Sequence, residues 1–216
     1  MALIGCVNAY QDADFLAVSL PPLIERCDRV VVVDGCYRDF AQYGCAAASD
    51  DGTEQVCAAY GADLLRAVDG LDEIGKRNRY LDVGGIGDWL LVVDADEIVD
   101  GEHDRGALRL GLANARQDDY WVRFHEARSG PDEARGRGVF RLHRWRPELR
   151  YVGTHHALHC GGRLLLTGTF HDGPTFEPIQ LRHVKHMRTV ERNERKAHYY
   201  QKLGEAERDF RARHKL

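Results

Sequence analysis

The sequence lacks long apolar runs and paired cysteines, and both absences narrow the classes of protein to consider. No stretch approaches the roughly 18 consecutive apolar residues that a membrane-spanning helix needs, and the first residues have neither the basic start nor the cleavage site of a signal peptide. The six cysteines have irregular spacing without a C-x-x-C pair, which argues against a structural zinc site. We therefore expect a cytoplasmic protein with reduced thiols and no transmembrane segment.

The overall composition is typical of an ordinary soluble protein, with 44% hydrophobic and 30% charged residues in a chain of 216. That length fits one domain and is sufficient for a sizeable core. Apolar strands alternate with helices through the first half of the chain, which predicts an α/β fold with a doubly wound, mostly parallel sheet. The expected strands are residues 3–7, 29–34, 62–68 and 88–94, and the expected helices are residues 12–26, 50–60 and 72–83.

The second half of the chain has shorter strand-like segments separated by polar turns, which predict a smaller antiparallel region. A long polar helix is expected from Thr189 to the C-terminus. Two irregularities interrupt the first half. Pro21-Pro22 is expected to kink or split its helix, and residues 35–49, rich in glycine, tyrosine and small side chains, are interpreted as an insertion loop.

The stretch from Trp89 to Glu97 is the most informative, because a hydrophobic strand there ends in Asp94-Ala95-Asp96. In an open α/β sheet, ligands bind beyond the carboxyl ends of the strands. Alternate residues of an extended chain point the same way, so Asp94 and Asp96 could converge on one cation. Hard divalent ions often bridge carboxylates to substrate phosphates. The acids alone could form a solvated turn, but the hydrophobic strand before them favours a Mn²⁺ or Mg²⁺ site.

This stretch resembles the D-x-D turn of family-2 glycosyltransferases, which have the GT-A fold. Three other stretches resemble motifs of that family, in the family's order. Residues 7–12 are similar to its first strand and loop, although Gln11 and Asp12 stand where the family has Asn and Glu. Residues 31–35 and 49–53 are similar to its second strand and D-G-T segment, split here by the insertion. Residues 75–78 are similar to its helix motif, a basic residue followed by Asn.

The resemblance implies a metal-dependent glycosyltransferase, of the inverting type, that uses a nucleotide-diphosphate sugar, with a UDP-sugar favoured as donor. The acceptor would be a glycan, a protein or a modified nucleic acid. The resemblance also implies that residues 1–216 form one glycosyltransferase domain. Its first 100 residues would bind the nucleotide sugar, and residues 101–216 would face the acceptor.

By the same resemblance, Asp34 would contact the base or ribose, and Lys76 or Arg77 would approach the base or the diphosphate. Asp94 and Asp96 would bind the ribose and the metal. The full set implied for nucleotide binding is Ala9, Tyr10, Asp12, Asp34, Lys76, Arg77 and Asp94.

His183 and His186 are candidates for one further metal ligand, because enzymes with this fold often add a histidine from the second half of the chain. Three residues apart on an extended chain they face opposite ways, so only one is expected to bind. His183 is favoured because it ends the alternating segment that begins at Ile179. The alternative for both is an ordinary hydrogen-bonded histidine.

An inverting transfer also needs a base for the acceptor proton. Glu126, Asp132 and His156 are the candidates. His156 is the residue proposed as the catalytic base, although it could instead bind the acceptor. Arg141, by contrast, is interpreted as part of a strand face.

Two other functions fit an α/β fold with an acidic turn. A nucleotidyltransferase usually has a glycine-rich phosphate loop after its first strand, and residues 8–12 lack one. A non-catalytic nucleotide-sugar-binding module would have no need of the acids that the turn retains.

Overall fold

A computed structural model describes most of the first 187 residues and little of the C-terminal segment. The described residues are 1–37, 46–67, 70–126, 138–153, 157–166, 173–187, 189, 190 and 194. The C-terminal helix expected from Thr189 and most of the insertion loop therefore lie outside the described residues. No helix in the described part of the chain is long and apolar enough to cross a membrane.

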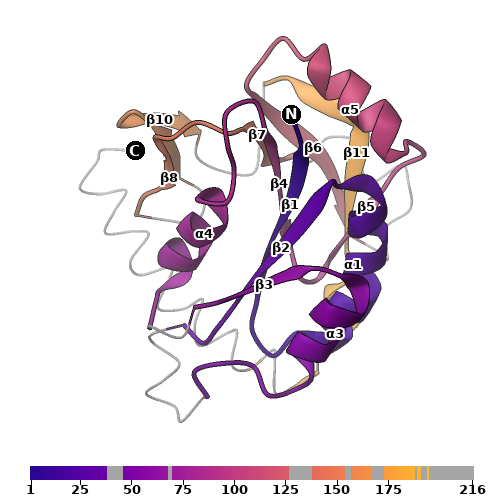
Figure 1. The fold of residues 1–216 in the computed structure, drawn as a ribbon, viewed down its shortest axis with the longest axis vertical. Coiled ribbons are helices and arrows are strands. Elements are labelled where there is room, and N and C mark those ends of the chain that lie inside the picture. Colours follow the sequence, from indigo (N-terminus) through magenta and orange to yellow (C-terminus); the bar gives the residue numbers. More distant parts are fainter. Residues whose placement is uncertain are drawn as a thin grey trace.

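Strands and helices alternate through the first half, and strands dominate the second half (Figure 1). The helices are α1 (Ala13–Arg26), α3 (Thr53–Tyr60), α4 (Glu73–Leu81), α5 (Arg105–Ala113) and the 3-10 turn η1 (Lys185–Met187). The strands are β1 (Leu3–Ala9), β2 (Arg29–Asp34), β3 (Asp63–Arg66), β4 (Trp89–Asp94), β5 (Glu97–Asp100), β6 (Asp119–Glu126), β7 (Gly138–Arg144), β8 (Leu149–Tyr151), β9 (Leu158–Cys160), β10 (Arg163–Leu166) and β11 (Thr175–His183).

The large sheet has the strand order β3-β2-β1-β4-β7-β6-β11-β5. The first four of these strands are parallel to one another, and β11 is parallel to β6, whereas β7 and β5 are antiparallel to their neighbours. A separate antiparallel sheet has the order β10-β9-β8. This topology confirms the predicted α/β fold with a mostly parallel sheet and a smaller antiparallel region.

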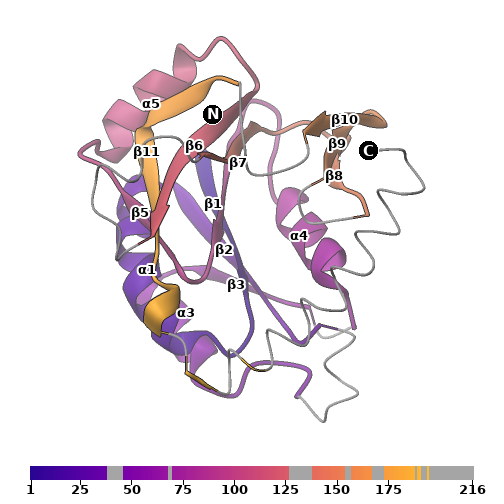
Figure 2. The same cartoon turned by 180° about the vertical axis from the view of Figure 1, so that it is seen from behind.

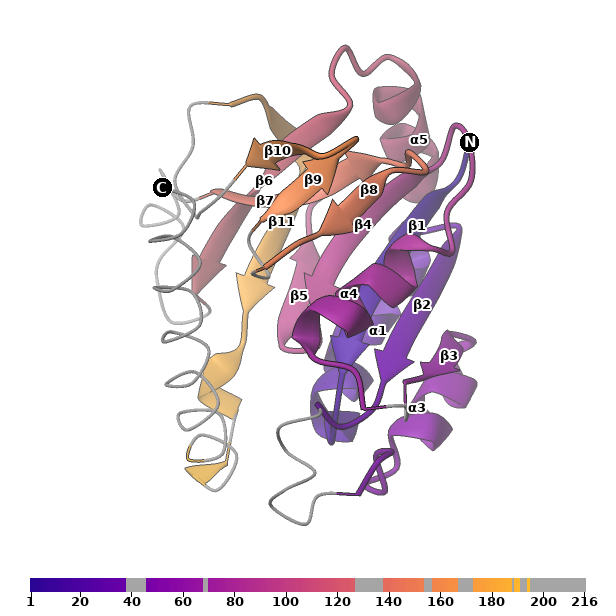
Figure 3. The same cartoon turned by 90° about the vertical axis from the view of Figure 1, so that its left-hand side faces the viewer.

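Both faces of the large sheet are covered, because successive strand residues point to opposite sides. On β4, Leu91 joins the core under α1, α3 and α5, and its neighbour Leu90 joins the core under α4 and the small sheet. Figures 2 and 3 show α4 and β8–β10 together on one side of the large sheet and α1, α3 and α5 on the other. Burial on both faces explains the continuous apolar runs of β1, β2 and β4.

Of the two expected effects of Pro21-Pro22, a kink or a split, the split does not occur, because α1 continues through both prolines to Arg26. Proline costs a helix a hydrogen bond, but α1 has a buried face that packs on the sheet, and that packing compensates. The residues of this face are Phe15, Leu16, Ser19, Leu20 and Leu23. The short strands β5 and β9 and the helix α5 were not predicted from the sequence.

Two side chains hold α4 against the small sheet and against the segment that follows β7. The Asn78 amide donates to the carbonyl of Tyr151 at 3.1 Å and accepts from its N–H at 2.8 Å. The Trp145 indole N–H donates to the carbonyl of Leu81 at 2.9 Å. The indole lies directly against Gly84, where a Cβ would overlap its ring. Glycine at this position therefore allows the close approach.

We predict that Gly84→Ala lowers the free energy of unfolding by about 1–3 kcal/mol, the usual cost of overpacking. Gly85→Ala is the matched control, because its Cβ would meet nothing closer than a carboxylate oxygen of Asp88 at 3.5 Å. The control should stay within about 0.5 kcal/mol of wild type. Urea unfolding of the three proteins checks this, and equal stability of the two variants would contradict the role given to Trp145.

Candidate functional site

The carboxyl ends of β1, β2 and β4 lie side by side. Ala9 is level with Asp34 on β2, and Asn8 is level with Asp94 on β4. From β1 the chain proceeds to β2 on one side, while β4 lies on the other, so the strand order reverses between β1 and β4. Ligands of open α/β sheets bind at such a switch point. We call the ends of these three strands, with the turn after β4, the carboxyl edge.

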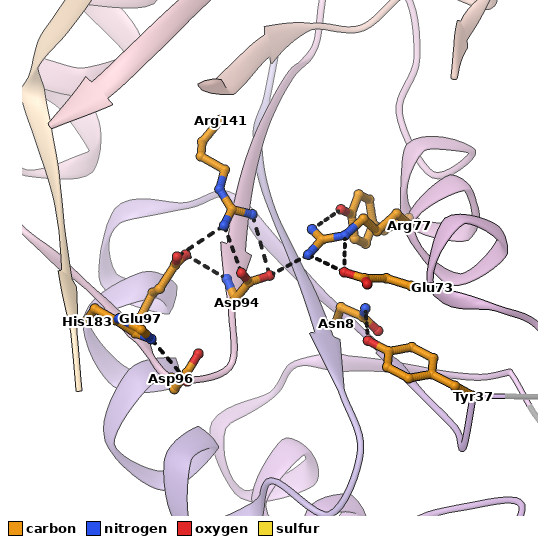
Figure 4. Close-up of polar contacts among 10 residues, drawn as sticks. Asn8, Tyr37, Glu73, Arg77, Asp94, Asp96, Glu97, Arg141 and His183 are labelled. Atoms are coloured by element: carbon orange, nitrogen blue, oxygen red, sulfur yellow. Dashed lines mark hydrogen bonds and ion pairs between the residues drawn. The ribbon is translucent and has the colours of Figure 1, made fainter. Parts of the chain in front are cut away.

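Two arginines hold the carboxylate of Asp94 at the centre of the carboxyl edge (Figure 4). Arg141, from β7, donates to Oδ2 at 2.7 Å, and Arg77, from α4, donates to Oδ1 at 3.0 Å. Arg77 is itself buried and forms a second ion pair with Glu73, one helical turn earlier, at 2.9 Å. Arg77 therefore contacts protein carboxylates here, and Asp94 has much of its charge neutralised.

Glu97 lies under the turn that follows β4. Its Oε2 accepts the N–H of Asp94 at 2.8 Å, and its Oε1 accepts from Arg141 at 3.1 Å. The side chain is almost completely buried. Burial raises the pKa of Glu97 to about 7, against the opposing effect of Arg141.

Asp96 and His183 are brought together across the sheet from positions 87 residues apart, with Nε2 of the imidazole 3.2 Å from Oδ2 of the carboxylate. The backbone explains the approach, because His183 on β11 is level with Glu97 on β5, and the N–H of Val184 donates to the carbonyl of Asp96 at 2.9 Å. His186 lies in η1 with its side chain exposed. Of the two candidate histidines, His183 is the one that meets the turn.

The Asp96–His183 pair fits two neighbouring ligands of a divalent ion. Donors about 2.1 Å from one ion lie roughly 3 Å apart in an octahedral arrangement, and the observed separation is 3.2 Å. Among the residues that the structure describes, no three His, Cys, Asp or Glu side chains surround one point. The described residues thus offer two ligands, one carboxylate and one imidazole, and phosphate oxygens and water could complete such a site. Asp94 is the poorer candidate, because two guanidinium groups already face it.

Asp34 is completely buried at the end of β2. One oxygen accepts from the Ser49 hydroxyl, and the other accepts from the Ser49 N–H at 3.2 Å and from Arg66 at 2.6 Å. Ser49 lies at the far end of the insertion, so Asp34 fixes the point where the insertion returns to the carboxyl edge.

Lys76 is also completely buried. Its ammonium donates to the carbonyls of Ala9 at 2.8 Å and Gly35 at 2.6 Å, and it lies 4.7 Å from the ring centre of Tyr37. It therefore joins the ends of β1 and β2. Burial lowers the pKa of Lys76 to about 7, although Asp34 and Glu73 act in the opposite direction.

The loop after β1 holds the remaining predicted nucleotide-binding residues. The Asp12 carboxylate accepts the N–H of Tyr10 at 2.8 Å, and the Tyr10 hydroxyl donates to the carbonyl of Ala46 at 2.8 Å. Gln11 has a φ of 52°, a conformation that few residues other than glycine adopt. Its N–H donates to the Ser49 hydroxyl at 2.7 Å, so the loop and the end of the insertion hold each other.

The predicted base cannot be located. His156 and Asp132 lie outside the described residues, and Glu126 ends β6 with a side chain that is also outside them.

Sequence reasoning missed the roles of Glu97 and Arg141. Glu97 lies three residues after Asp94, a spacing that suits a side chain folding back on a turn. No local signal marks Arg141, which reaches Asp94 across 47 residues.

No protein-family model and no curated protein matches the sequence. Similar solved structures include S. aureus TarS 1–349 in complex with UDP-GlcNAc, with 20% identity and a TM-score of 0.44 over 61% of this chain and 37% of that one. Glucosyl-3-phosphoglycerate synthase from Mycobacterium tuberculosis, with Mn²⁺, UDP and glucosyl-3-phosphoglycerate, has 15% identity and a TM-score of 0.39 over 58% of this chain and 44% of that one.

A nucleotidyl transferase from Methanothermobacter is similar with 15% identity and a TM-score of 0.34, over 65% of this chain and 70% of that one. The chain spans only 23% of the longer TarS chain that it matches. These similarities concern the course of the main chain alone.

We predict that Lys76 makes folding stability rise with pH above 7. The unfolded chain keeps its lysines protonated to about pH 10.4, whereas the buried amine loses its proton near pH 7. Between these values the unfolded state binds the extra proton, so the free energy of unfolding increases with pH by up to about 1.4 kcal/mol per unit. Below pH 7 Lys76 contributes no slope.

Urea unfolding of wild type and Lys76→Met at pH 6, 7, 8 and 9 measures this effect. The difference in free energy between the two proteins should be flat below pH 7 and change in favour of wild type above it. A constant difference across the whole range would show that Lys76 stays protonated in the fold.

Proposed function

We propose that this chain is a glycosyltransferase that moves a sugar from a nucleotide-diphosphate sugar, with UDP-sugars favoured, to an acceptor hydroxyl. The reaction would depend on Mn²⁺ or Mg²⁺ and would invert the anomeric centre. The acceptor would be a glycan, a protein or a modified nucleic acid.

One observation carries this proposal: the Asp96–His183 pair lies beside Asp94, at the switch point of a parallel sheet. The order of the four sequence motifs supports it independently. A metal–diphosphate site needs oxygen and nitrogen donors that leave coordination positions for phosphate, and this pair supplies two. The arginine-held Asp94 suits a hydrogen bond to a ribose hydroxyl better than it suits ligation of a cation.

In the proposed reaction, Asp96 and His183 would hold the metal ion, which would neutralise charge on the departing nucleoside diphosphate. Asp94 would orient the ribose, and Lys76 would maintain the spacing of the strand ends beside it through the carbonyls of Ala9 and Gly35. The acceptor hydroxyl would attack the anomeric carbon as the bond to the diphosphate oxygen breaks. Its proton would pass to a base, for which His156 remains the candidate.

Hydrolysis of a panel of nucleotide sugars, with Mn²⁺ and with EDTA, tests the proposal. We predict that wild type releases nucleoside diphosphate only with the metal. Asp96→Ala should lose about 100-fold or more, because metal stabilisation of the leaving group is worth several kcal/mol. Asp63→Ala is the control, since Asp63 is half exposed at the amino end of β3, in an ion pair with Arg29.

Full hydrolysis in EDTA, or full activity in Asp96→Ala, would contradict the metal site. Pyrophosphate release from nucleoside triphosphates in place of sugar hydrolysis would identify a nucleotidyltransferase. Binding of a nucleotide sugar without any turnover would identify a binding module.

The two histidines should differ in their effect on metal affinity. With UDP present, His183→Ala should weaken Mn²⁺ binding by roughly tenfold or more, whereas His186→Ala, on an exposed turn, should leave it unchanged. Both affinities can be measured by electron paramagnetic resonance of free Mn²⁺. Equal affinities in the two variants would remove His183 from the metal site.

A further inference from the structure

Glu97 is a buried carboxylate whose two oxygens serve two different parts of the carboxyl edge. It is 3% exposed. Oε2 accepts the backbone N–H of Asp94, and Oε1 accepts from the guanidinium of Arg141. The same Arg141 nitrogen also donates to the Asp94 carboxylate at 2.7 Å. Glu97 therefore contacts both the main chain of Asp94 and the group that holds its side chain (Figure 4).

Stability alone does not explain a carboxylate at this position. Burying an ionised group is costly, and apolar replacements of buried ion pairs are often neutral or stabilising. β5 is short and Glu97 is its first residue, so an apolar side chain there would extend the adjoining core. The contacts of Glu97 instead fix the geometry of the turn that carries Asp94 and Asp96.

The turn needs such support because it reverses the chain within two residues. β4 ends at Asp94 and β5 begins at Glu97, so Asp96 has no strand partner of its own. Its carbonyl is held from one side by Val184. Glu97 holds the other end of the turn through the N–H of Asp94.

We propose that Glu97 is a positioning residue of the metal and donor site. It fixes the turn so that Asp96 faces His183, and it orients Arg141 so that the charge of Asp94 is neutralised. This inference rests on the proposed function, because it assigns Glu97 a role in metal binding. Residues that support metal ligands in this way typically change metal affinity or activity by 10–100-fold when they are replaced.

The first variant is Glu97→Gln, which keeps the size of the side chain and one carbonyl acceptor but removes one of the two carboxylates that Arg141 contacts. With UDP present, the apparent Kd for Mn²⁺ should rise by about tenfold or more. Sugar-nucleotide hydrolysis should show a raised requirement for Mn²⁺ with a kcat within about threefold of wild type at saturating metal. A merely structural defect would lower kcat at every metal concentration.

Glu177→Gln is the matched control, because Glu177 is 58% exposed and forms an ion pair with Arg123 on a distant part of the sheet. It should leave the Mn²⁺ requirement unchanged.

Arg141→Gln breaks the contact between Glu97 and Arg141 from the other side and provides the test if Glu97→Gln does not fold. In the double variant the loss should be smaller than the product of the two single losses, since both substitutions remove the Glu97–Arg141 interaction.

A further measurement separates the failure of this inference from the failure of the proposed function. Hydrogen exchange of the Asp94 amide should be slow in wild type and fast in Glu97→Ala, whether or not the chain binds nucleotides. If wild type binds no Mn²⁺ with UDP, the proposed function and the metal role of Glu97 both fall. If wild type binds Mn²⁺ and both Glu97→Gln and Arg141→Gln match it, the role of Glu97 alone is overturned.

Discussion

The carboxyl edge depends on one carboxylate shared by two guanidinium groups. Asp94 joins β4 to α4 through Arg77 and to β7 through Arg141. Asp94 is itself only partly buried, but both arginines are largely buried, so the loss of Asp94 would leave two guanidinium groups without this partner. The arrangement thus ties two elements, α4 and β7, to the end of β4. With Glu73 and Glu97 included, three carboxyl groups face two arginines at this edge.

Burial of the sheet on both faces decides where polar chemistry can occur. Along β1, β2 and β4, apolar side chains enter one of two cores, so functional groups emerge only where the strands end. Asn8, Asp34 and Asp94 mark these ends on three neighbouring strands. Two of the polar groups found there, Asp34 and Lys76, are fully buried and hold backbone in place. The edge therefore contains a supporting layer of polar groups as well as Asp94, Asp96 and His183.

The sequence predicted those features that are encoded locally. The apolar runs identified β1, β2 and β4, and the acids after β4 identified the turn. His183 was favoured because it ends an alternating segment, and the fold brings it to Asp96. The contacts of Arg141 depend on the pairing of β4 with β7, which no local pattern encodes. The burial of Asp34 likewise depends on Ser49, which reaches it from beyond the insertion. The contacts that could not be predicted are therefore those that depend on pairing between segments far apart in the sequence.

The amide of Asn78 has a consequence for the small sheet. β8 is an edge strand, and an open edge presents backbone groups that can pair with another chain. At Tyr151 the Asn78 side chain occupies both the N–H and the carbonyl, as a neighbouring strand would. One helical side chain thus imitates a peptide group and occupies both backbone groups of Tyr151 on this edge. Its neighbour in sequence, Arg77, donates to Asp94, so consecutive residues of α4 serve the edge of the small sheet and the carboxylate turn.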